Sequence, residues 1–291
     1  MSFKNLTLLF LTVLLVNVLP TLAATNKDFT IIETPWLVLI SKDTNNQKNN
    51  MISKKTCPGA LINPQAVLTT VTCLDLNLEE TKNLIVEAYN QSRQVSQVNL
   101  REFNPQYFLH NNYALLKLSE PFLLSSNLNT IILASVNEYL DILKCQQLTH
   151  YDTSSDNTSI SRVMGKISFS NNSYCYRDMS QLHISYQKPS ISWHPSILCS
   201  THFNILPCIK LQDWSAMVIC PRSNDPNIFV LVGFQLTFLV FDSKPAENKL
   251  TIGDDDCIIV YSNMFQASPW IKEQIDDFND DEVSIENENI Y

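Results

Sequence analysis

Glycine is scarce in this sequence. The 291 residues hold only four glycines, Gly59, Gly165, Gly233 and Gly253, whereas an average usage of about 7% predicts about 20. Glycine lets a backbone approach a ligand closely or take up a positive φ angle. Binding sites that rely on such backbone therefore have few positions available in this chain.

Positive charge is also limited, and negative charge gathers at one end. The formal net charge is -9, and the last 16 residues hold seven acidic and no basic residues. The remaining chain is therefore nearly neutral, which argues against a broad basic face for nucleic acid. We expect residues 276–291 to form a solvated, disordered acidic tail, with binding of a basic partner as the alternative.

After the N-terminus, no segment of the sequence is long and apolar enough to cross a membrane. Lys4, the apolar run of residues 6–19 and the small residues up to Ala24 fit a secretory signal peptide over residues 1–24. A membrane anchor is the alternative, but the run is shorter than a bilayer span. The sequence thus predicts a secreted, extracellular protein without a membrane partner.

Tightly spaced metal ligands are also missing. All eight cysteines follow the predicted signal peptide, and an even number in an exported chain indicates four disulfides. The nearest metal candidates, His194, Cys199, His202 and Cys208, match no zinc spacing. We therefore expect no metal and no cofactor.

What the sequence does contain is a series of strand signals. Short runs rich in Val, Ile, Leu, Phe and Tyr alternate with polar clusters and show no sustained helical period. Examples of the expected strands are residues 36–40, 66–71, 84–89, 113–118, 130–134, 147–150, 161–169, 217–220, 228–238 and 258–261. Residues 268–275, with Pro269 at the first helical position, predict a short closing helix. The fold class is therefore all-β with a short C-terminal helix.

Several motifs resemble those of the chymotrypsin-like (trypsin-like) serine proteases. Residues 57–73 keep the family's frame of Cys-x-Gly-x-Leu-Ile followed by Val-Leu-Thr-x-x-x-Cys. The segments at 35–38, 111–118 and 270–271 resemble its Pro-Trp-x-Val, Asn-Asp-Ile-Ala-Leu-Leu-Lys-Leu and Trp-Ile landmarks, in order. The resemblance implies two six-stranded antiparallel β-barrels, over residues 25–142 and over residues 143–275 with the closing helix.

The same resemblance implies how the cysteines pair. Sequence arithmetic alone leaves about 105 pairings of eight cysteines open. The family's pairing, carried onto this chain, joins Cys57 with Cys73, Cys145 with Cys220, Cys175 with Cys199, and Cys208 with Cys257.

The resemblance also locates the three catalytic positions, and each holds another residue type. Acyl transfer by this mechanism needs an imidazole base, a carboxylate that orients it and a nucleophilic hydroxyl. The base position holds Thr72, the carboxylate position Asn112 and the nucleophile position Trp214. Ser215, one residue further on, would be presented only by a shifted loop.

Other parts of the proteolytic machinery are altered as well. Gln212 replaces the small glycine of the oxyanion hole, where a close backbone approach is needed. Leu206 maps near the base of the specificity pocket, and Phe238 and Ile259 map to its walls. No basic residue followed by Ile-Val-Gly-Gly occurs near residues 30–33, so no activation site is visible.

These substitutions predict a secreted, non-catalytic serine protease homologue that acts by binding an extracellular protein, such as an active protease or an inhibitor. One alternative is an active serine endopeptidase with a displaced or atypical triad, and another is a structural component of a secreted fluid. Trp193, Trp214 and Phe238 are expected either to plug the vacated cleft or to form a contact patch there. N-glycosylation is expected at the sequons of Asn90, Asn157 and Asn171.

Overall fold

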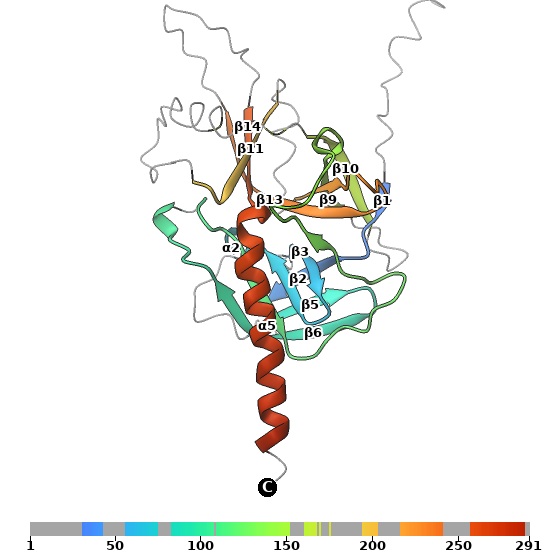
Figure 1. Cartoon of the computed structure of the whole chain (residues 1–291), viewed down its shortest axis with the longest axis vertical. Helices are drawn as coiled ribbons and strands as arrows, with labels where there is room; N and C mark the ends of the chain where they lie inside the picture. Colours follow the sequence, from blue (N-terminus) through green and yellow to red (C-terminus); the bar gives the residue numbers. More distant parts are fainter. Residues whose placement is uncertain are drawn as a thin grey trace, which may run out of the picture. The chain divides into compact units, whose positions relative to one another are not determined.

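The computed structural model (Figure 1) describes residues 31–42, 56–74, 83–107, 109–151, 160–167, 169, 175, 194–202, 216–240 and 257–288. The predicted signal peptide lies outside the described residues. So do the predicted site residues Asn157, Asn171, Trp193, Leu206, Cys208, Gln212, Trp214 and Ser215.

Six strands close into a barrel in the first half of the chain. Its strands pair antiparallel in the order β2-β3-β4-β7-β6-β5. They are β2 (Leu37–Lys42), β3 (Thr56–Asn63), β4 (Ala66–Thr69), β5 (Leu84–Ala88), β6 (Gln91–Leu100) and β7 (Ala114–Leu118). Inward-facing Val38, Leu61, Val67, Val86 and Leu116 are at most 1% exposed and fill its core. The first predicted barrel is therefore confirmed.

The remaining strands form an eight-stranded sheet. The order is β1-β10-β9-β12-β13-β14-β11, with β8 paired in parallel to β13. The strands are β1 (Ile31–Glu33), β8 (Ile132–Leu133), β9 (Gln146–Tyr151), β10 (Ile160–Lys166), β11 (Ile197–His202), β12 (Met217–Pro221), β13 (Phe229–Val240) and β14 (Cys257–Ser262).

The predicted second closed barrel is not formed by the described strands. Between the β10 side and the β11 side of this sheet, the described residues make a single isolated bridge, from Phe169 to Ser200. A ladder there would need several consecutive pairs, as in the first barrel. Both β1 and β8, which belong to the predicted N-terminal domain, pair with strands of this second sheet.

The C-terminal helix α5 (Met264–Glu288, orange-red in Figure 1) is longer than predicted. Asn263 caps it, because its side-chain oxygen accepts the Phe265 N–H at 3.1 Å. The helix thus begins four residues before Ser268, and Pro269 lies inside it. The helix continues through residues 276–288, which belong to the segment expected to form the acidic tail.

Helix α5 packs on the sheet through one stripe of side chains. Met264, Ala267, Ile271 and Phe278 are at most 5% exposed, at the spacing expected for one helical face. No helix in the described part of the chain has the length and apolarity to span a bilayer.

Three of the four predicted disulfides are present. They join Cys57 with Cys73, Cys145 with Cys220, and Cys175 with Cys199. The fourth, Cys208 with Cys257, stays a prediction because Cys208 lies outside the described residues.

Candidate functional site

Thr72 lies on the single helical turn α2 (Val71–Leu74), which directly follows strand β4. The hydroxyl of Thr70 accepts the Cys73 N–H at 3.3 Å and closes this turn. The disulfide from Cys73 to Cys57 then ties the turn to β3. The backbone at the position that the resemblance assigns to the catalytic base is therefore fixed by a side-chain hydrogen bond and by a disulfide.

Asn112 lies just before β7 and is fully buried. Its neighbour Asn111 has a φ of 48°, in the left-handed region that asparagine tolerates better than most residues. Tyr113 then donates its N–H back to the Asn111 carbonyl at 2.9 Å. This tight turn directs the Asn112 side chain into the interior.

The structure brings Thr72 and Asn112 into direct contact. The Asn112 Oδ1 accepts the Thr72 N–H at 3.2 Å, and the Asn112 Nδ2 lies 3.3 Å from the Thr72 hydroxyl. The hydroxyl also lies 3.5 Å from Oδ1. An amide and a hydroxyl offer both donors and acceptors, so the two side chains satisfy one another.

This pair is chemically different from an imidazole and a carboxylate. Neither a threonine hydroxyl nor an asparagine amide titrates near neutral pH, so neither group can accept a proton from a nucleophile. The third position, Trp214, and its neighbour Ser215 lie outside the described residues. The described geometry thus covers the base and acid positions alone.

The side chain of one residue that the resemblance assigns to the specificity pocket is described in the second sheet. Ile259, which the resemblance assigns to a pocket wall, is fully buried, and it pairs in register with Phe238. The side chain of Phe238 is not among those described. The pocket wall expected at this position is therefore a bulky aliphatic side chain that is fully buried.

A chain of buried polar groups runs beside that wall. The Gln147 amide donates to Gln235, and the Tyr261 hydroxyl donates to Gln147 at 3.1 Å. The Ser200 hydroxyl lies 3.3 Å from that of Tyr261, and all four residues are at most 3% exposed. Burial raises the pKa of Tyr261, so this phenol stays neutral and keeps its proton for Gln147.

A histidine–serine pair near Asn112 was missed by the sequence reasoning. The Nδ1 of His194 lies 2.7 Å from the Ser196 hydroxyl and also accepts the Ser196 N–H at 3.1 Å. The Ser196 hydroxyl accepts the Asn111 N–H at 2.9 Å, and the His194 ring stacks on His110 at 4.5 Å. The spacing His-x-Ser was the only signal in the sequence, and it is too common to be informative.

Burial, the neighbouring His110 and the charge of Arg101 lower the pKa of His194. Below its unfolded pKa of about 6.5, the unfolded chain therefore binds more protons at this residue than the folded chain does. We expect the stability of the wild type to fall as the pH drops from 7.5 to 5, and to fall less in His194→Gln. Urea midpoints of both proteins at the two pH values measure this difference, and equal falls would contradict it.

One glycosylation candidate is described. Asn90 lies in the exposed two-residue turn between β5 and β6, where a glycan would meet no packed side chain. Its occupancy stays a prediction.

Comparison with known proteins gives the family of this chain. The model of the trypsin family matches residues 25–190, more than half of the 291 residues. The match includes the closed barrel, with Thr72 and Asn112. The chain therefore belongs to the trypsin family, and it is a protein related to serine proteases. No curated protein sequence matches it.

Proposed function

We propose that this protein is a secreted, non-catalytic member of the trypsin family that acts by binding another extracellular protein. The contact between Thr72 and Asn112 carries the proposal, because the positions of base and orienting acid hold two groups that satisfy each other. With threonine at the base position and asparagine at the acid position, peptide cleavage by the family's mechanism lacks its usual general base.

The scaffold itself supports a binding role. Three disulfides tie its strands together, and such bonds persist in oxidising, extracellular surroundings. Loops on a rigid scaffold carry recognition well, because their sequence can vary without loss of the fold. The partner we propose is a protein of the same fluid, such as an active protease that this chain positions or an inhibitor that it occupies.

The pair of His194 and Ser196 supports the second candidate, a serine hydrolase with a displaced catalytic pair. Its 2.7 Å separation is within the reach needed for proton transfer. However, Ser196 is only 3% exposed, and its hydroxyl already accepts the Asn111 N–H. A substrate could not reach this oxygen unless the surrounding chain moved, so we favour the binding role.

A regulatory assay tests the proposal. The purified protein is added to active trypsin-like proteases and to their protein inhibitors, and the cleavage of a peptide substrate is followed. We expect no cleavage by the protein alone and a change in the KM or in the inhibition of at least one partner. Cleavage by the protein alone, lost in Ser196→Ala or in Ser215→Ala, would overturn the proposal in favour of the second candidate.

A further inference from the structure

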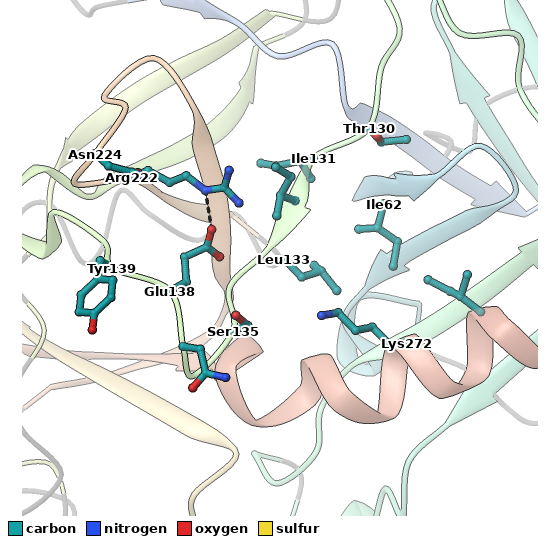
Figure 2. A pocket seen from close by; sticks show the side chains of 13 residues that line it. Ile62, Thr130, Ile131, Leu133, Ser135, Glu138, Tyr139, Arg222, Asn224 and Lys272 are labelled. Carbon is teal, nitrogen blue, oxygen red and sulfur yellow. Dashed lines mark hydrogen bonds and ion pairs between the residues drawn. The ribbon is translucent and has the colours of Figure 1, made fainter.

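A cavity of about 490 Å³ lies away from the degenerate catalytic positions. It is bounded by the end of β3, the segment 130–139 that includes β8, the turn after β12 and one face of α5, as Figure 2 shows. Neither Thr72 nor Asn112 lines it. Its size is in the range of cavities that bind small ligands or anchoring side chains.

Apolar side chains form much of the cavity wall. Ile62, Ile131, Leu133 and Ile275 line it, and Figure 2 shows Ile62, Ile131 and Leu133 around the hollow. Ile131 is 3% exposed and belongs to the main core, so this wall is fixed by packing behind it. A bound apolar group would bury these surfaces without rearranging the core.

Two cationic side chains reach the same cavity. The Arg222 Nε–H donates to Glu138 at 2.5 Å, and within the described part of the chain the other guanidinium N–H groups of Arg222 make no hydrogen bond. Lys272 is exposed on α5, and its ammonium group points toward Leu133 and Ser135 in Figure 2. With one carboxylate and two cations, the lining carries a net positive charge in an otherwise acidic chain.

The rim of the cavity is unusually apolar for an exposed surface. Ile132 and Tyr139 line the cavity, yet they are 45% and 85% exposed, and Val136 between them is 68% exposed. A small molecule in the cavity would leave much of this rim in contact with water. Covering these side chains calls for a longer chain, and exposed apolar groups beside a cavity are typical of surfaces that contact proteins.

We propose that this cavity and its rim, here called the Lys272 face, bind an acidic segment of a protein partner that anchors an apolar side chain in the hollow. The apolar anchor packs on Ile131 and Leu133, and a carboxylate of the segment pairs with Lys272 and the free N–H groups of Arg222. The inference rests on the proposed binding function and moves its surface from the old catalytic cleft to the face beside α5.

Two matched peptides test the ligand chemistry by fluorescence anisotropy. The probe is a labelled peptide, Glu-Leu-Phe-Glu-Leu-Glu, and its partner carries Lys in place of each Glu. We expect the acidic peptide to bind and the basic one to bind at least about tenfold more weakly, since charge complementarity decides partner choice. Equal binding of the two peptides, or no binding of the acidic one, would overturn the proposal.

Two variants test the location. Lys272→Glu should weaken the binding of the acidic peptide on the order of tenfold and strengthen the binding of the basic one. Lys144→Glu is the matched control, because Lys144 is 65% exposed, lies outside the cavity lining and undergoes the same charge change. Ile132→Ser should weaken the binding of both peptides, because an apolar contact is lost. Equal losses in Lys272→Glu and Lys144→Glu would overturn the location.

Two further outcomes separate this inference from the proposed function. If sodium octanoate displaces the acidic peptide and binds as tightly, the cavity takes small carboxylates and the assignment to a protein partner is wrong. If a protease or inhibitor found in the regulatory assay responds equally to the wild type and to Lys272→Glu, the binding function stands and this surface is wrong. Cleavage of substrates by the protein alone would instead overturn the proposed function.

Discussion

Gly233→Ala is expected to destabilise the fold by about 3 kcal/mol or more, at the upper end of what overpacking costs. A Cβ at this position would lie 2.2 Å from the carbonyl oxygen of Ser262 and 3.4 Å from the Cβ of Tyr261. The clashing atom belongs to the backbone of β14, which pairs with β13 on one side and with β11 on the other. The sheet cannot relieve the clash without breaking its own hydrogen bonds.

Gly59→Ala is the matched control for this substitution. Its Cβ would meet the tip of Ile40 at 2.9 Å and that of Val67 at 3.0 Å, with the Leu68 carbonyl oxygen at 3.2 Å. Side-chain tips can turn aside, so the expected cost is about 1–2 kcal/mol. Urea unfolding of both variants measures the difference, and an equal or larger loss for Gly59→Ala would contradict the packing described here.

The double variant Cys145→Ala/Cys220→Ala should lose about 4 kcal/mol of unfolding free energy. The bond joins the residue before β9 to β12 across 75 residues, and both cysteines are fully buried. By the loop-entropy relation, the bond across 16 residues between Cys57 and Cys73 should contribute about 3 kcal/mol.

Guanidinium unfolding of both double variants under non-reducing conditions measures this order. Alanine replaces both partners, so no free thiol remains to form a wrong pair. A greater loss on removal of the shorter bridge would show that native packing, and not the length of the constrained loop, decides the contribution of each bond.

The sequence predicted the strands whose apolar side chains face a core. Strands β4, β7 and β12 have almost every residue buried, so continuous apolar runs mark them clearly. Strand β6 was missed because its sequence, QSRQVSQVNL, is mostly polar and Val95 is its only buried side chain. Its place in the barrel is set by pairing with β5 and β7, which no local pattern reveals.

The helix start was predicted wrongly for a similar reason. Ser268 and Pro269 fit the start of a helix, but Asn263 provides a cap five residues before Ser268, and Met264 and Ala267 add buried contacts. Tertiary packing of these side chains stabilises the helix by more than Pro269 destabilises it. The missing N–H of Pro269 removes only one hydrogen bond of the helix.

The candidate site was likewise predicted from the sequence only in part. The frame around Cys57 and Cys73 located Thr72 from the sequence, and the run before β7 located Asn112, but only the fold shows that the two side chains meet. The Lys272 face could not be found from the sequence, since it joins Ile62, residues 130–139, Arg222 and α5. Those segments are separated along the chain and come together only through the pairing of β8 with β13 and the docking of α5.

Reaction with a serine-directed fluorophosphonate tests most directly whether this member of the trypsin family is chemically silent. The probe forms a covalent bond only with a serine that a neighbouring base activates, and intact mass spectrometry counts the adducts. Our account predicts an unchanged mass under conditions in which trypsin gains one adduct per molecule. One adduct per molecule, mapped to Ser196 or to Ser215, would contradict it.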